Sequence, residues 1–453
     1  MKVFEKAFCS MACLSILAFA ASAACAAGLE LGSPFSDNMV LQRGRPVPVW
    51  GWTAPKAEVV VRFAGQEARG KADGTGAWRV ELKPMAASKT SQKLEVESGG
   101  RRRVVSNVLV GEVWLASGQS NMALPVWGDC PRFRDRQGGM LLRYLRRPYV
   151  RLADVSTQTY SEKPKSRVAC RWHPVAPGMP EGFSAVAFYY ALELYGQLDV
   201  PIGVIGAYRS GTNIDAWTPR DGILSWQPQL SMERDWKFVG NPENLPDAEW
   251  TCLYGRHPVN APHQQPSVLW NEMVAPIAPF AVRGLVWYQG CHNHAPGESE
   301  RYCDKMHALY NGWASAFENP DFRLYFAQLA PWGGQSAKGG AGWSVIAENQ
   351  ARFAREQPKS GMAVLCDLGN LDDIHPNDKE PVARRLALHA LKDLYGETGI
   401  VADSPVLRSY EVRNGRFYLT FDNVESWYVY AMNRSRAPQF QVAGEDGRFE
   451  DAR

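Results

Sequence analysis

A serine with small polar neighbours follows a predicted buried strand, and its type and position suit nucleophilic chemistry. The strand covers residues 108–115, and Gly118 and Gln119 come directly before Ser120. A serine placed at the end of a strand beside a glycine can present an exposed hydroxyl and nearby backbone N–H groups to a substrate. The same segment also fits an ordinary turn with an incidental serine, because glycine and serine favour turns. A base that reaches Ser120 would decide between the two interpretations.

A histidine beside carboxylates lies far downstream, at His375. It follows Asp372 and Asp373 and precedes Pro376, on a short loop before a predicted helix. A neighbouring carboxylate can fix the tautomer of an imidazole and stabilise the imidazolium that forms when a serine proton is removed. Alone, such a pair is equally typical of a capping aspartate next to a surface histidine. Together with the Ser120 segment, it favours a serine hydrolase.

Several motifs resemble those of the sialate O-acetylesterase family, which belongs to the SGNH-type hydrolases. The strongest are the segments 111–122, 286–290 and 373–379. Further similar segments, which extend the resemblance from about residue 30 to the end of the chain, are 35–43, 49–52, 201–205 and 214–217.

The resemblance implies a role for each member of a catalytic triad. Ser120 would be the nucleophile, His375 the general base and then the general acid, and Asp373 the partner that orients the histidine. The wider SGNH pattern places the acid three residues before the histidine, which leaves Asp372 as an alternative. We favour Asp373 because it falls on the Asp-Ile-His-Pro motif of the family.

The resemblance also implies an oxyanion hole. Two of its donors would be the backbone N–H groups of Ser120 and Gly211, and a side-chain amide from Gln289 or Asn293 would complete it. Trp217 and Trp287 flank the motifs, and aromatic faces suit sugar rings. The candidates for contact with substrate are Gln119, Asn121, Trp217, Trp287 and His292.

Two segments depart from the usual sequence of the family. After Gly290 the family carries Glu-Ser-Asn-Ala, whereas this chain carries Cys291 and His292, then Asn293 and His294. Before Gly211 the family prefers Ser-Trp-Gly, whereas this chain has Tyr-Arg-Ser at 208–210. Both departures bear on substrate preference.

The histidines at 292 and 294 also raise the question of a metal site. Cys291 or Cys303 would be a further ligand, but no carboxylate or third ligand lies at a convincing spacing. We therefore expect neither a metal nor an organic cofactor. Cys291 is expected to be a small buried residue or the disulfide partner of Cys303.

The chain of 453 residues is too long for one ordinary core, and its patterns divide it into four parts. Residues 1–27 are typical of a secretory signal peptide, with Cys25 as a less favoured site of lipid attachment. Short alternating strands with glycine-rich turns predict a β-sandwich over 28–107. Strand–helix alternation over 108–399 predicts an α/β domain with a three-layer parallel sheet of the SGNH (flavodoxin-like) type. Residues 400–453 are β-rich and are expected to be shorter than in the family.

Within the α/β part, individual elements can be placed. Buried strands are expected at 108–115, 204–207, 284–288, 324–329 and 362–366, and helices at 185–197, 302–317 and 379–394.

Charge and hydropathy argue against a nucleic-acid-binding protein and against a membrane-spanning protein. The formal net charge is only +3, and the basic clusters at 101–103 and 143–151 match no nucleic-acid motif. The apolar stretch at 7–21 is too short for a lasting membrane span. We therefore expect an exported periplasmic or extracellular serine esterase that removes O-acetyl groups from glycans, either O-acetylated sialic acid or acetylated xylan-type sugars. The alternative is a glycan-binding protein that keeps the fold without turnover.

Overall fold

The computed structural model describes residues 28–226, 262–334, 342–424, 441–446 and 448–451. The predicted signal peptide, Cys25 and Cys252 lie outside these residues. None of the described helices is long and apolar enough to cross a bilayer.

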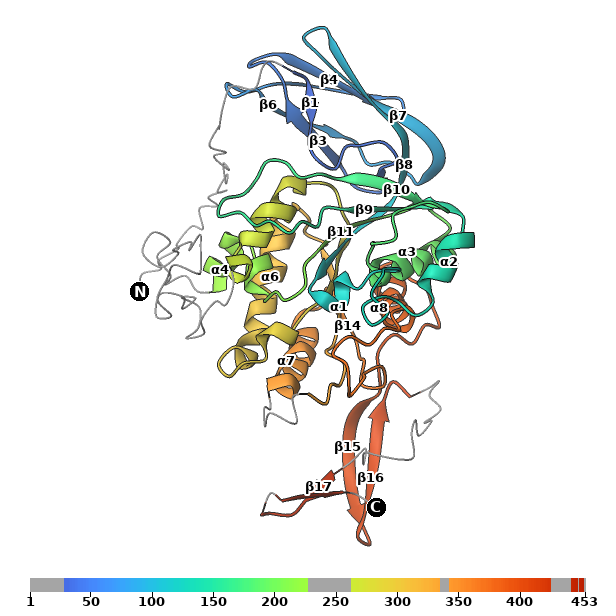
Figure 1. The fold of residues 1–453 in the computed structure, drawn as a ribbon, viewed down its shortest axis with the longest axis vertical. Coiled ribbons are helices and arrows are strands. Elements are labelled where there is room, and N and C mark those ends of the chain that lie inside the picture. The colour runs from blue at the N-terminus through green and yellow to red at the C-terminus, as the bar shows by residue number, and fades with distance from the viewer. Residues whose placement is uncertain (1–27, 227–261, 335–341, 425–440, 447, 452–453) are drawn as a thin grey trace, which may run out of the picture.

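The N-terminal strands form two sheets at one end of the molecule (Figure 1). One sheet has the order β1-β3-β6, and the other connects β5, β4, β7, β8 and β2. Alternating side chains of β4 and β6 are buried, as expected for strands with one face against a core. The strands are β1 (Glu30–Leu31), β2 (Val40–Gln42), β3 (Val47–Trp52), β4 (Glu58–Phe63), β5 (Gln66–Lys71), β6 (Ala77–Leu82), β7 (Ser88–Ser98) and β8 (Arg101–Gly118).

The long strand β8 continues into a central sheet with the order β10-β9-β11-β8-β12-β13-β14. From β9 to β14 all neighbours in this order are parallel, whereas β10 is antiparallel to β9. The expected all-parallel sheet is therefore one part of a larger mixed sheet, because β10 is antiparallel to β9 and β8 also pairs with the antiparallel β7. The further strands are β9 (Arg147–Asp154), β10 (Arg171–Val175), β11 (Ile202–Tyr208), β12 (Gly284–Tyr288), β13 (Arg323–Ala327) and β14 (Ser360–Ala363).

Helices cover both faces of this sheet (Figure 1). On β8, Val113 and Leu115 belong to the core beneath α6 and α7, whereas Trp114 and Ala116 belong to the core beneath α3 and α8. Since successive side chains of a strand point to opposite faces, one continuous apolar run supplies both cores. The helices are α1 (Ser120–Ala123), α2 (Gly138–Tyr144), α3 (Ala185–Leu198), α4 (Arg220–Trp226), α6 (Tyr302–Ala316), α7 (Gly342–Glu356) and α8 (Glu380–Asp393).

Short helical turns connect these elements, and two small antiparallel pairs follow α8. The first pair, β15 with β16, extends away from the rest of the molecule (Figure 1), and most of its side chains are exposed. The turns are η1 (Asp215–Trp217), η4 (Pro262–Gln264), η5 (Trp270–Val274), η6 (Ala275–Ile277), η7 (Cys291–Asn293) and η8 (Ser299–Arg301). The late strands are β15 (Val406–Arg413), β16 (Arg416–Asp422), β17 (Gln441–Ala443) and β18 (Phe449–Asp451).

Candidate active site

The central strands end at one level, and this level positions the candidate residues. Gly118 at the end of β8 lies in register with Tyr208 of β11 and with Tyr288 of β12. The segments that follow these three strands carry Ser120, Gly211 and Asn293. Because the carboxyl ends of parallel strands share one edge, residues distant in sequence meet there.

Gly118 allows the chain to pass from β8 into α1. Its φ is +146°, and a Cβ at this position would lie 2.2 Å from the carbonyl oxygen of Tyr288. Gln119 then leads into the helix that begins at Ser120. Ser120 is only 6 % exposed, so the hydroxyl is more covered than the exposed serine that was expected. The covering group at its hydroxyl is the imidazole of His375, which lies within hydrogen-bond distance.

His375 meets Ser120 although 255 residues separate them. Its Nε2 lies 2.8 Å from Ser120 Oγ, and its ring packs edge-on against Phe133 at a centroid distance of 5.1 Å. Burial lowers the pKa of His375; the charge of Lys379 lowers it further, whereas Asp373 opposes the shift. An imidazole that stays neutral is suited to accept a proton from a serine.

Asp373 is the carboxylate that approaches the imidazole. Its Oδ1 accepts a hydrogen bond of 2.9 Å from the backbone N–H of His375 and lies 3.7 Å from Nδ1. The second distance is an ion-pair contact rather than a hydrogen bond. Asp372 is exposed, and its backbone N–H donates to Asn370 Oδ1. The geometry thus favours Asp373 over Asp372 as the partner of the histidine.

Two backbone N–H groups near Ser120 are available to a ligand. Gly211 has a φ of +71° in the turn after β11, and a Cβ there would meet nothing within 4 Å. Ser120 is the first residue of α1, where a helix leaves its N–H groups without internal acceptors. Within the part of the chain that the structure describes, neither N–H group donates a hydrogen bond.

The side-chain amide of Gln289 is not free to donate to an oxyanion, as one of the sequence-based predictions required. Its Nε2 lies within 3.1 Å of three acceptors, namely Thr212 O, Asn293 Oδ1 and Gln119 Oε1. Tyr302 donates its hydroxyl to Oε1 at 2.7 Å. An amide has only two N–H groups, so these protein acceptors use both of them. Gln289 fixes the segments around the site and has no donor left for an oxyanion.

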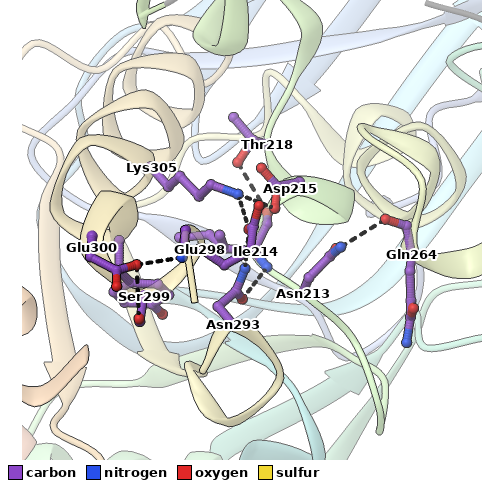
Figure 2. Close-up of polar contacts among 12 residues, drawn as sticks. Asn213, Ile214, Asp215, Thr218, Gln264, Asn293, Glu298, Ser299, Glu300 and Lys305 are labelled. Atoms are coloured by element: carbon purple, nitrogen blue, oxygen red, sulfur yellow. Dashed lines mark hydrogen bonds and ion pairs between the residues drawn. The ribbon is translucent and has the colours of Figure 1, made fainter. Parts of the chain in front are cut away.

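Asn293 is held in one orientation by its neighbours (Figure 2). Its Oδ1 accepts from the backbone N–H of Ile214 at 3.0 Å and from Gln289 Nε2 at 2.8 Å. Because two donors point at the same atom of the amide, that atom must be the oxygen. The Nδ2 group therefore points away from Ile214 and Gln289. Nδ2 donates one hydrogen bond, to Glu298 Oε2 at 3.4 Å.

A buried ion cluster supports this amide (Figure 2). Lys305 lies 2.9 Å from Asp215 Oδ2 and also contacts Glu298, and the lysine side chain is 2 % exposed. Burial alone would lower the pKa of Lys305, but the two carboxylates raise it above its usual value. Lys305 therefore stays charged and links the Gly211 turn to the segment that carries Asn293.

A second buried lysine, which the sequence motifs did not single out, lies beneath Ser120. Lys379 Nζ donates to Asn121 Oδ1 at 2.6 Å, and Asn121 Nδ2 donates to Ile374 O at 3.0 Å. Asn121 thereby ties the serine segment to the histidine loop. Burial lowers the pKa of Lys379 to about 7, and the negative charges of Asp135 and Asp373 oppose the shift. Lys379 is part of the 373–379 motif, which was the only sequence signal for it.

The residues predicted to contact substrate differ in their exposure to solvent. Trp217 and Trp287 are fully buried, so they cannot wall a cleft as expected. Their places on η1 and β12 put them in the core beneath α6. Gln119 is 4 % exposed and accepts from the backbone N–H groups of Gly290 and His292. Of the five candidates, only His292 has an exposed side chain.

The histidines and cysteines around residue 291 do not converge on a metal. His292 Nε2 lies 2.6 Å from Gln264 Nε2, whereas His294 Nδ1 lies 2.6 Å from the carbonyl oxygen of Cys291. Cys291 and Cys303 are both buried and both free, so the disulfide considered between them is absent. Burial raises the pKa of Cys291 to about 12, which keeps its thiol protonated.

Similarity to known proteins agrees with this geometry. The rat sialate O-acetylesterase is 30% identical over 442 residues, which cover 87% of this chain and 79% of the rat protein. The chain belongs to the sialate O-acetylesterase family. The human member is 29% identical and is covered over 77% of its length. No family model matches the chain.

A solved structure extends the family likeness to the fold. A carbohydrate acetylesterase from Xanthomonas citri superposes with a TM-score of 0.78 and 30% identity, over 94% of this chain and 88% of that protein. An α/β architecture with a mixed sheet is therefore shared with an acetylesterase.

Proposed function

We propose that this member of the sialate O-acetylesterase family is a serine esterase that removes O-acetyl groups from glycans. The observation that carries the proposal is the hydrogen-bond distance of 2.8 Å between Ser120 Oγ and His375 Nε2. The names of the rat enzyme and of the Xanthomonas citri enzyme support acetylated sugars as the substrate class.

The reaction follows from the positions of the proposed groups. Ser120 Oγ attacks the acetyl carbonyl carbon while His375 takes the hydroxyl proton. The tetrahedral intermediate collapses, the C–O bond to the sugar breaks, and the imidazolium returns the proton to the sugar oxygen. Water, deprotonated by His375, then attacks the acetyl carbonyl carbon of the acetyl-enzyme. The C–O bond to Ser120 Oγ breaks, His375 returns the proton to Oγ, and acetate leaves. Asp373 stabilises the imidazolium in both halves of the reaction.

The oxyanion would be bound by donors from three segments. These are the N–H groups of Ser120 and Gly211 and the remaining N–H of Asn293 Nδ2. Loss of one such donor typically costs about 2.7–4 kcal/mol of transition-state stabilisation. Exposed His292 is the proposed contact for the sugar.

The finer architectural predictions belong to the same proposal. When β9 and β10 at one edge are left aside, the other five strands β11-β8-β12-β13-β14 follow the chain order 2-1-3-4-5, which supports a flavodoxin-like SGNH layout. A β-sandwich over 28–107, a β-rich segment over 400–453 and export through the segment 1–27 stay predictions.

Hydrolysis of p-nitrophenyl acetate by Ser120→Ala tests the mechanism. We expect kcat to fall about 10⁴- to 10⁶-fold, as for removal of other catalytic triad members. Ser117→Ala is the matched control, because Ser117 Oγ is buried without a hydrogen-bond partner. Equal rates for wild type and Ser120→Ala would refute the esterase and favour a glycan-binding protein. Acetate release from O-acetylated sialic acid and from acetylated xylo-oligosaccharide then identifies the preferred sugar.

A further inference from the structure

Three ligand-type side chains meet between α6 and α7, away from the catalytic residues. Cys303 and His307 are one helical turn apart and therefore share one face of α6. Glu356, the last residue of α7, reaches both. Sequence spacing does not single out this set, since Glu356 lies 49 residues after His307.

The distances suit tetrahedral coordination of a cation. Glu356 Oε2 lies 3.5 Å from Cys303 Sγ and 3.0 Å from His307 Nε2, and all three atoms lie within 4.8 Å of one another. Metal–ligand bonds of about 2.0–2.3 Å make the edges of a tetrahedral zinc site roughly 3.3–3.7 Å long. Small side-chain adjustments would therefore be enough to bind a metal.

Neighbouring groups hold these ligands in place. Arg352 Nε lies 2.7 Å from the other oxygen of Glu356, and the His307 ring packs on Phe353 at 4.7 Å. Such contacts around the ligands orient metal sites in general.

Charge and access also fit a divalent cation. A thiolate at Cys303 and the Glu356 carboxylate would carry two negative charges, which suit a divalent cation. The Cys303 side chain is buried, whereas those of His307 and Glu356 are 29% and 41% exposed. A cation would approach from the exposed side, where water would supply a fourth ligand.

We propose that Cys303, His307 and Glu356 form a binding site for zinc or a similar thiophilic divalent cation that joins α6 to α7. On binding, the Cys303 S–H bond breaks, its proton passes to solvent, and the sulfur, His307 Nε2 and Glu356 Oε2 bond the metal. No electron transfer is involved. The site uses no catalytic residue, so its effect is to stabilise the pair of helices over one face of the sheet.

Titration of the chelator-treated full-length protein with Co²⁺ tests the site, because tetrahedral cobalt thiolates absorb visible and near-ultraviolet light. We expect about one Co²⁺ per chain, displacement by Zn²⁺, and a thermal midpoint a few degrees higher with Zn²⁺. Cys303→Ser should abolish the thiolate absorption. Glu356→Gln, an exposed change that leaves the core intact, should weaken binding at least about 10-fold.

Cys366→Ser is the control, because Cys366 is an exposed free thiol elsewhere in the chain. It should bind cobalt as the wild type does. Absence of the thiolate absorption in the wild type would overturn the proposal. So would an absorption that persists in Cys303→Ser, or unchanged affinity in Glu356→Gln.

Discussion

Lys379 determines much of the electrostatics beneath Ser120. It is fully buried, its Nζ donates to Asn121 and lies 5.1 Å from the centre of the Tyr288 ring. Where the family carries a glutamate, this chain has Cys291, whose thiol stays protonated. Among the described residues no carboxylate forms an ion pair with Lys379 Nζ. The lysine acts on the proposed reaction through Asn121 and through its charge.

We predict that Lys379→Met shifts the acidic limb of the profile of kcat/KM against pH to higher pH. The charge of Lys379 lowers the pKa of His375, so its removal raises the pKa of the base. Loss of the Asn121 contact should also lower kcat about 10- to 100-fold. Lys359→Met, at a partly exposed lysine, is the control. An acidic limb that does not move would contradict this role.

The same lysine predicts how stability depends on pH. Its pKa is about 7 in the folded protein against an ordinary value of 10.5, so the unfolded chain binds more protons between these values. The free energy of unfolding should therefore rise with pH across this window, by at most about 1.4 kcal/mol per pH unit. Below about pH 7 Lys379 is protonated in both the folded and the unfolded protein, so the folded protein bears the whole free-energy cost of the buried charge.

Urea unfolding of wild type and Lys379→Met at about pH 7.5 and about pH 9.5 measures this slope. The unfolding free energy of the wild type should rise relative to that of the variant by roughly 2–3 kcal/mol from the lower to the higher pH. Equal pH dependence of the two proteins would show that Lys379 keeps an ordinary pKa.

Sequence motifs singled out Ser120, His375 and Asp373 as candidates because these motifs combine chemistry with position, and the structure brings the three residues together. Ser120 follows a strand, and His375 and Asp373 share one loop, so local pattern was sufficient. It did not predict the use of Gln289 or the burial of Trp217, because the partners of an amide or indole depend on packing between distant segments.

At the level of elements, the buried ion cluster of Lys305 couples η1 to α6. Lys305→Met would leave the buried Asp215 and the partly buried Glu298 without their cation. Breaking a buried pair in this way typically costs about 3–5 kcal/mol. We therefore expect a clear loss of stability in chemical denaturation, with a lower kcat because Asn293 loses its support.

The control for this prediction is Lys359→Met. Lys359 pairs with Asp321 at 3.3 Å and also donates to Pro320 O, and its side chain is 36% exposed, so the change should cost less than about 1 kcal/mol. Equal effects of the two substitutions would mean that the buried cluster does not stabilise these elements.

Most helices and strands of the central sheet layer were predictable from the spacing of apolar residues and from the length of each apolar segment. The helices expected at 185–197, 302–317 and 379–394 are α3, α6 and α8. The strand expected at 284–288 is β12. The antiparallel β10 was missed because Arg171–Val175 is short and carries no clear alternation.

At the level of the whole molecule, β8 belongs to both parts of the chain. It runs from Arg101 to Gly118 and passes through the predicted boundary at 107/108. Its buried Glu112 pairs with Arg43 at 2.6 Å and with Arg283 at 3.0 Å. The sequence analysis did not predict this continuity, because it treated residues 101–103 only as a basic cluster and began the buried strand at residue 108.

A shared strand predicts that the N-terminal sheets and the central sheet unfold together. Scanning calorimetry should show one transition for these parts, since loss of β7 pairing exposes β8. Limited proteolysis at the same temperatures should remove both parts at once. Two resolved transitions with separate protected fragments would contradict this coupling.

The most direct test of the account is to locate the acetyl group during turnover. Wild-type protein is mixed with an O-acetylated glycan, quenched in acid and mapped by peptide mass spectrometry, with Ser120→Ala and Ser117→Ala treated in parallel. The account predicts an acetyl group on Ser120 in the wild type and in Ser117→Ala, and none at that position in Ser120→Ala. Acetate release by Ser120→Ala at the wild-type rate, or an acetyl group carried by another residue, would contradict it.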